Sequence, residues 1–130
     1  MKLTRYEIRT RTAESRANRS IDMIKPGCTF DFDEVNQDSD LVEAFDTAEA
    51  AMAALSSYET YVNFFSNANM QYVSVCEYWI EENVYNVDEG GDLEWIDGGG
   101  ILEFSAMPAT IELRGVDYSW NSFAGRYIAP

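Results

Sequence analysis

Histidine is absent from this 130-residue chain, and cysteine and proline are scarce, with two and three copies. Without histidine the usual general base of neutral-pH catalysis is missing, and two cysteines alone supply too few ligands for a zinc site. The sequence also lacks a Gly-x-Ser-x-Gly elbow, a phosphate-binding glycine loop and a Ser-x-x-Lys motif. We therefore expect a protein that is not an enzyme and that uses no metal or cofactor.

Positive charge is missing from the middle of the chain. Residues 26–113 contain no Lys or Arg but 19 of the 23 acidic residues, whereas seven of the nine basic residues lie in the first 25 positions. The net charge is -14, and direct binding of nucleic acid or anionic lipid, which needs clustered Lys and Arg, is not expected. Two interpretations stay open: an acidic surface that serves solubility, or a surface that binds a specific basic partner.

Long apolar runs are also missing, so the sequence predicts no membrane span. The N-terminal segment is charged and has no apolar core, which argues against a signal peptide. We expect a cytoplasmic protein that does not contact the membrane. The sequence does not indicate an oligomeric state.

What is abundant is apolar and aromatic residues, at 46% and 14% of the chain. This composition is typical of a folded protein, and the length suits one compact domain over residues 1–130. The sequence shows no internal repeat, linker or shift in composition that would mark a second domain.

The first third of the chain predicts a strand, a short helix and a second strand. Residues 3–11 alternate, with Tyr6 and Ile8 on one side and mostly arginines on the other, which would suit an acidic neighbouring strand. An apolar stripe then predicts a short helix over 13–24, ended by the Pro-Gly pair that follows it. Residues 28–33 form a candidate strand.

The main helix is expected over residues 46–65. Asp46 and Glu49 have the spacing of a capping box, and apolar residues recur at helical intervals from there to Val62. The alanine-rich composition adds helix propensity.

Residues 72–105 predict a three-stranded meander, with turns at 88–92 (DEGGD) and 97–100 (DGGG). Residues 109–113 predict a last strand, and the aromatic segment 116–130 is expected to pack back onto the sheet, or else to dock onto a partner. The predicted fold class is therefore α+β: an antiparallel sheet, built from the meander and the N-terminal strand, packed against the helices at 46–65 and 13–24.

Two further features were weighed as sites. The acidic loop 31–40 supplies oxygen ligands, but its spacing departs from an EF-hand because Val35 takes a ligand position and the required glycine is missing, so a solvated loop is preferred to weak calcium binding. Cys28 and Cys76 lie in apolar contexts, where buried thiols are expected and a disulfide is possible but not implied.

The meander region supplies the candidate partner-binding site. Carboxylates spaced along strands and turns can imitate the phosphates of a duplex and so occupy the basic channel of a nucleic-acid-binding protein. Its two tryptophans are candidate aromatic anchors, although packing in the core is the preferred interpretation for both. The candidate residues are Glu77, Glu81, Glu82, Asp88, Glu89, Asp92, Glu94, Asp97, Trp79 and Trp95.

The segments YEIRTRT, AFDTAEAAMAALSSYE and EYWIEENVYNVDEGGDLEWI, in that order, resemble small accessory proteins of phages and conjugative elements of gut bacteria, some of which are anti-CRISPR or anti-restriction inhibitors. The likeness covers residues 4–10, 44–59 and 76–97 and includes no signature residue, so no functional position is carried over. It implies a small acidic inhibitor of a host nucleic-acid-binding complex such as a CRISPR effector. The basic N-terminal strand departs from a uniformly acidic mimic and could neutralise the sheet internally.

The sequence thus leads to a functional hypothesis and one alternative. The hypothesis is a non-enzymatic inhibitor from a phage or mobile element that binds a basic protein surface through its acidic hairpin region. The alternative is a small structural or regulatory domain of a mobile element, whose acidity serves solubility.

Overall fold

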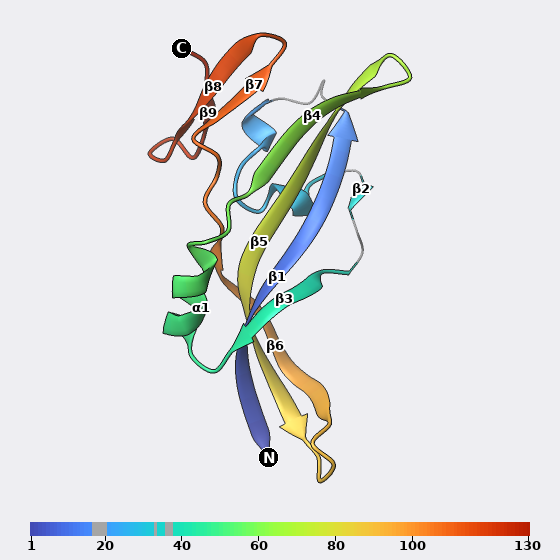
Figure 1. Cartoon of the computed structure of the whole chain (residues 1–130), viewed down its shortest axis with the longest axis vertical. Coiled ribbons are helices and arrows are strands. Elements are labelled where there is room, and N and C mark those ends of the chain that lie inside the picture. The colour runs from blue at the N-terminus through green and yellow to red at the C-terminus, as the bar shows by residue number, and fades with distance from the viewer. Residues whose placement is uncertain (17–20, 33, 36–37) are drawn as a thin grey trace.

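The computed structural model describes residues 1–16, 21–32, 34–35 and 38–130. Figure 1 shows an elongated molecule made mostly of strands. The helical segments are α1 (Ala48–Leu55) and the single 3-10 turns η1 (Ile21–Met23) and η2 (Cys28–Phe30). The strands are β1 (Lys2–Arg16), β2 (Glu34–Val35), β3 (Asp40–Phe45), β4 (Tyr61–Asn67), β5 (Met70–Val87), β6 (Leu93–Phe104), β7 (Thr110–Leu113), β8 (Val116–Asn121) and β9 (Arg126–Ile128).

Two long antiparallel strands, β1 and β5, form the centre of the larger sheet. Their register runs from Lys2 opposite Asn86 to Arg16 opposite Tyr72. β2 and β3 pair with the other side of β1, while β4 and β6 pair with successive halves of β5. The start of β1 and the β5–β6 hairpin consequently project beyond α1 at the lower end of Figure 1.

The two faces of this sheet have separate apolar cores, because side chains alternate along each strand. On one face Ile8 and Ile80, which are cross-strand partners, pack with Ala51 and Leu55 of α1. On the opposite face Val73 and Val75 belong to a second core with Cys28, Ile111 and Tyr127. The small sheet β7–β8–β9 therefore covers the upper part of the face opposite α1.

The predicted α+β class is wrong, since the described chain is β-rich and α1 is its only α-helix. The main helix expected over 46–65 is limited to Ala48–Leu55 and is capped by Thr47, whose side chain accepts the Ala50 N–H, instead of by the Asp46 capping box. After α1, residues 56–60 form a turn and an isolated bridge, and residues 61–65 of the expected helix belong to β4, which pairs with β5. Its aromatic and β-branched residues favour strand, and pairing with β5 outweighs the helical spacing.

The short helix expected over 13–24 is also wrong in its described parts. β1 continues through Arg16, and Ala13 lies buried opposite Val75, so cross-strand burial outweighs local helix propensity. After it the described chain forms only the single turn η1. The strand expected over 28–33 begins instead as the 3-10 turn η2.

The meander expected over 72–105 is a two-stranded hairpin instead. Its turn at 88–92 is confirmed, with the Asp88 carboxylate accepting the N–H groups of Gly90 and Asp92. The glycines at 97–100 lie inside β6 and make no turn. There the β5–β6 register shifts three times, leaving Ile96, Gly99 and Leu102 without a partner in β5, as β-bulges do.

Several local predictions are confirmed. The N-terminal strand is β1, residues 109–113 contain β7, and the segment 116–130 packs back through β8 and β9, with Tyr127 buried in the core. Both cysteines are free thiols, and the predicted burial is confirmed for Cys28, whereas Cys76 is half-buried. Part of the acidic loop 31–40 lies outside the described residues, and so do residues 17–20 of the expected short helix.

Gly98 should be the least replaceable glycine of β6. Its φ is +114°, and an added Cβ would lie 2.4 Å from the Glu82 carbonyl oxygen. We expect Gly98→Ala to lower the free energy of unfolding in urea by on the order of 1–3 kcal/mol, because both the left-handed φ and the clash must be relieved. Gly100→Ala is the matched control, since nothing lies within 4 Å of its Cβ position. Equal effects of the two substitutions would contradict this packing.

Candidate functional site

The ten residues proposed for partner binding do not lie on one surface. Trp79, at 2% exposure, and Glu77, at 0%, are buried, and Glu81 is half-buried. Trp95 is 56% exposed. The remaining six, the outer carboxylates, are half-buried or exposed: Glu82, Asp88, Glu89, Asp92, Glu94 and Asp97.

Strand alternation explains this division. Odd-numbered residues of β5 share a face with the odd-numbered residues of β1, including Arg5 and Arg9, whereas Glu82 points to the opposite face. The register also places Glu94, opposite Asn86, and Asp97, opposite Val84, on the Glu82 face. Glu77 and Glu81, the inner carboxylates of β5, therefore lie on the face that carries the arginines of β1, and Glu82 does not.

A buried carboxylate, Glu7, is the centre of the polar network on the arginine-bearing face. Glu7 is only 1% exposed and accepts hydrogen bonds from Arg9 Nη1 at 2.7 Å, Asn83 Nδ2 at 3.2 Å and the Tyr85 hydroxyl at 2.5 Å. Arg5 Nε lies 3.6 Å from its second oxygen. A buried carboxylate is tolerated only when such partners replace water, so this network fixes β1 against β5.

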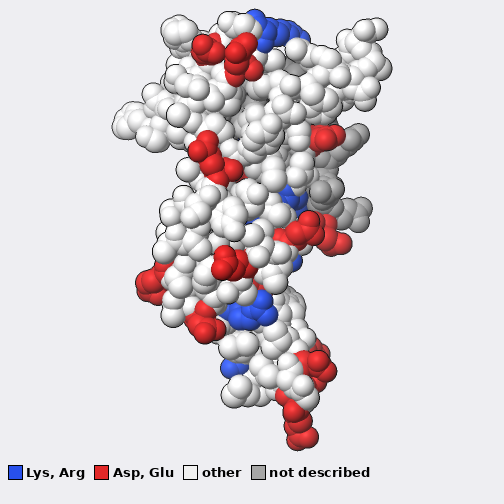
Figure 2. Space-filling model, viewed as in Figure 1, with Lys and Arg blue, Asp and Glu red and all other residues white. Residues whose placement is uncertain are grey.

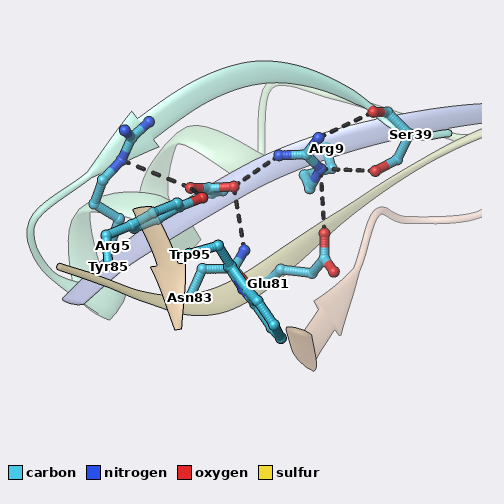
Figure 3. A network of polar contacts seen from close by, with 8 residues as sticks. Arg5, Arg9, Ser39, Glu81, Asn83, Tyr85 and Trp95 are labelled. Carbon is cyan, nitrogen blue, oxygen red and sulfur yellow. Dashed lines mark hydrogen bonds and ion pairs between the residues drawn. The ribbon is translucent and has the colours of Figure 1, made fainter. Parts of the chain in front are cut away.

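Arg9 connects the network to the outer strand and to β5. Its Nε and Nη2 donate to the side chain and carbonyl of Ser39, at 2.7 and 2.9 Å. Its Nε also lies 3.2 Å from a Glu81 carboxylate oxygen. Figure 3 shows Arg9 between Ser39 and Glu81. Glu81 is therefore neutralised within the fold.

Trp95 is held by the same network. Its indole Nε1 donates to Asn83 Oδ1 at 2.9 Å, and Tyr85 is its cross-strand partner. Figure 3 shows the indole beside Asn83. One side of the ring stays in solvent, so Trp95 is an exposed aromatic group in a fixed orientation, a geometry that suits an interface anchor.

Burial raises the pKa of two groups in this network, Tyr85 and Glu81. The pKa of Tyr85 is raised to about 12, mainly by burial and further by its hydrogen bond to Glu7. Burial also raises the pKa of Glu81, while the charge of Arg9 acts in the opposite direction. At neutral pH the Tyr85 hydroxyl therefore stays protonated and donates to Glu7.

Glu77 anchors the turn that precedes η2. Its carboxylate accepts the Gly27 N–H at 2.6 Å and the Thr29 hydroxyl at 2.9 Å. Burial raises its pKa, against the opposing effect of these hydrogen bonds. On the same face Arg11 lies over the rings of Phe30 and Trp79. Glu77 and Trp79 thus belong to the interior and lie out of reach of a partner.

At the end of the β5–β6 hairpin the carboxylates face solvent, in contrast to Glu77 and Glu81. No ion pair among the described residues involves any of the six outer carboxylates. Figure 2 shows acidic groups at the projecting lower end and further, separate groups over the rest of the visible face, with basic patches between them. On this face the acids do not form one continuous band.

The structure brings together residues that the sequence did not single out, namely Glu7, Asn83 and Tyr85. One signal was present, since a lone acid between Arg5 and Arg9 at alternate strand positions predicts a shared face. The cross-strand partners could not be read without the register. Among the described residues no group of three or more Cys, Asp or Glu is placed to hold a metal ion, and no described helix has the length and apolar character to cross a membrane.

Comparison with protein-family models, with curated proteins and with solved structures gives no match.

Glu7→Gln tests whether the buried network stabilises the fold. Removing the charge leaves Arg5 and Arg9, each about one-fifth exposed, with less compensation. We expect the free energy of unfolding in urea to fall by roughly 3 kcal/mol, the lower end for breaking a buried charge pair. The exposed Glu94→Gln should change it by less than about 0.5 kcal/mol. A Glu7→Gln variant as stable as the Glu94 control would show that the network carries no net stability.

Glu77 should make stability fall as the pH rises. Because its pKa is raised in the folded state, the unfolded chain loses this proton first, so the stability present below the ordinary pKa of 4.5 is lost as the folded group ionises. Glu77→Gln has no proton to lose. Urea unfolding from about pH 4 to about pH 7 should show wild-type stability falling relative to this variant. A constant or rising difference would contradict the assigned direction.

Proposed function

We propose that this protein is a non-enzymatic binding protein that uses the projecting end of its β5–β6 hairpin to contact a basic surface of another protein. The observation that carries the proposal is the contrast within one strand pair. The inner carboxylates are buried or paired with arginines, whereas the six outer carboxylates have no ion pair in the described structure. The half-exposed Trp95 belongs to the same hairpin and lies on its arginine-bearing face.

The hairpin projects from the body of the protein, which supports contact between its end and a partner protein. β5 and β6 extend past α1, and the Glu7 network stiffens their base. A rigid projection loses little conformational entropy on binding, and its unpaired charges steer a basic partner toward it. Trp95 adds an exposed aromatic anchor on the same hairpin.

For the partner class we propose a nucleic-acid-binding protein of a host defence system, such as a CRISPR effector. The support is the charge of the hairpin together with the resemblance to accessory proteins of phages and mobile elements. Binding would exclude DNA or RNA from the partner by steric and electrostatic competition.

A second candidate function is favoured by a specific observation. Arg9 neutralises Glu81 within the fold, and the acids on the face in Figure 2 lie in separate groups. These features suit a small structural or regulatory domain of a mobile element whose acidity serves solubility.

Charge reversal at the hairpin end distinguishes the two candidates. The variant replaces the exposed Asp88, Glu89, Asp92 and Glu94 by Lys and leaves the paired Glu81 unchanged. The tagged protein is incubated with nuclease-treated lysate of a bacterium with active CRISPR and restriction systems. We expect the wild type to retain a basic nucleic-acid-binding protein at low salt and release it at high salt, since salt screens exposed charges, and the variant to retain at most about one-tenth as much.

The control reverses four exposed acids near α1 and β3, namely Asp40, Glu43, Asp46 and Glu49, and so changes the net charge equally. It should bind like the wild type, and circular dichroism should show both variants folded. Equal loss of binding in both variants would indicate nonspecific charge attraction. No retained protein in any sample would favour the solubility interpretation.

A further inference from the structure

Two strand edges without partners face each other in the upper half of the molecule, at the other end from the hairpin tip. In the described part of the chain β4 pairs only with β5, and β7 pairs only with β8. A groove of about 460 Å³ separates them, lined by Glu59 to Phe64 on one wall and by Pro108 and Thr110 to Glu112 on the other. Figure 1 shows both strands in this upper region. Proteins normally protect exposed strand edges from pairing with other chains. Two free strand edges on one groove therefore indicate that the groove binds another chain.

The turns of both hairpins define which backbone groups point into the groove. Ala68 and Asn69 both have positive φ, as in a two-residue type I′ turn, so Asn67 and Met70 form a hydrogen-bonded pair. Hydrogen-bonded and non-bonded pairs then alternate along the ladder. The N–H and C=O groups of Val62 and Phe64 consequently point away from β5, toward the free edge.

The same reasoning applies to β7. Arg114 and Gly115 have positive φ, so Leu113 and Val116 are the hydrogen-bonded pair next to the turn. The Trp120 N–H donates to the Ala109 carbonyl at 2.9 Å, which agrees with this alternation. The outward backbone groups of β7 are therefore those of Thr110 and Glu112, which line the groove.

The base of the groove is closed. Thr60 N–H donates to the Ala106 carbonyl at 2.8 Å, and Glu59 and Ala106 form a parallel bridge. The two chain segments thus leave this point in the same direction and separate to either side of the groove. An extended peptide placed between them could pair with both edges by strand addition.

The charge of the groove selects the kind of peptide. Glu59 and Glu112 line it, and no Lys or Arg is among its described lining residues. A second copy of this chain is disfavoured, because the longer edge strands that it could offer, β3 and β6, are themselves acidic at Asp40, Glu43, Glu94 and Glu103. The other two described edge strands, β2 and β9, are only two and three residues long. Like charges placed opposite each other destabilise strand pairing, whereas opposite charges stabilise it.

We propose that the groove between β4 and β7 binds an extended, lysine- or arginine-bearing segment of a partner protein by strand addition. This surface goes beyond the hairpin function and does not rest on it. The partner segment would take main-chain hydrogen bonds from the outward groups of both strands, and its basic side chains would approach Glu59 and Glu112.

Amide hydrogen exchange, followed by NMR on the full chain, tests the pairing residue by residue. The probe is the peptide acetyl-Lys-Val-Lys-Val-Lys-amide. Before it is added, the outward amides of Val62, Phe64, Thr110 and Glu112 should exchange quickly. With the peptide at saturation they should slow by at least about tenfold. Ladder amides should change little, those of Asn63, Phe65 and Ile111 being the reference.

Two control peptides separate strand addition from charge alone. Acetyl-Lys-Pro-Lys-Pro-Lys-amide keeps the charge but has fewer N–H donors, and acetyl-Glu-Val-Glu-Val-Glu-amide reverses the charge; neither should slow the outward amides. The variant Glu59→Gln with Glu112→Gln should weaken binding of the lysine–valine peptide, whereas the hairpin variant Asp88→Asn with Asp92→Asn should not. Retained affinity in the groove variant together with loss in the hairpin variant would overturn the proposal.

Three further results would also overturn it. The first is that the lysine–valine peptide leaves exchange at the four outward amides unchanged. The second is that the proline peptide slows these amides equally. The third is that the amides exchange slowly before any peptide is added and the protein sediments as a dimer. The last result would assign the groove to a second copy of the chain. None of these results bears on the hairpin, whose charge-reversal experiment leaves the groove residues unchanged.

Discussion

The antiparallel pairing of β1 with β5 is the constraint on which the rest of the structure depends. It places the arginine-bearing strand beside the strand that carries three glutamates. Each of the two faces it creates is then covered by a different element, α1 on one side and the small sheet on the other. Because β4 occupies only the first half of β5, the second half continues into the projecting hairpin. Packing, charge and the proposed contact surface all follow from this one register.

Local signals predicted those elements whose stability is local. Alternation identified the N-terminal strand, and the turn at 88–92 was predictable because its glycines and the Asp88 side chain form the turn without distant help. The helix expected over 46–65 failed where local spacing competed with pairing, since β4 gains a full ladder with β5. The turn predicted at 97–100 was wrong for another reason. Gly98 permits the close approach of β6 to Glu82 and Asn83, a requirement set by the bulged register of β6 on β5 and not by the glycine run itself.

The sequence predicted which acidic residues make up the candidate site, but not which of them are neutralised inside the fold and which face solvent. Charge distribution alone identified the acidic hairpin. Which carboxylates are neutralised depends on the face that each shares with the arginines of β1, and this needs the register of two strands about seventy residues apart. Glu81 therefore belongs to the Glu7 network and Glu77 is buried against the turn at η2, while Glu82 faces the other way. The internal neutralisation that the basic N-terminal strand suggested is real at Glu81, and it leaves the hairpin end as an acidic surface without ion pairs in the described structure.

The most direct test of the central claim is site-specific photo-crosslinking in bacterial cells that carry active CRISPR and restriction systems. A photoreactive amino acid replaces Glu89 at the hairpin tip, and the control carries it at Glu49 on α1, which is equally exposed. The account predicts that Glu89 crosslinks to a basic nucleic-acid-binding protein, identified by mass spectrometry, and that Glu49 does not. Crosslinks to the same protein from both positions, or from Glu49 alone, would contradict the hairpin as the contact surface.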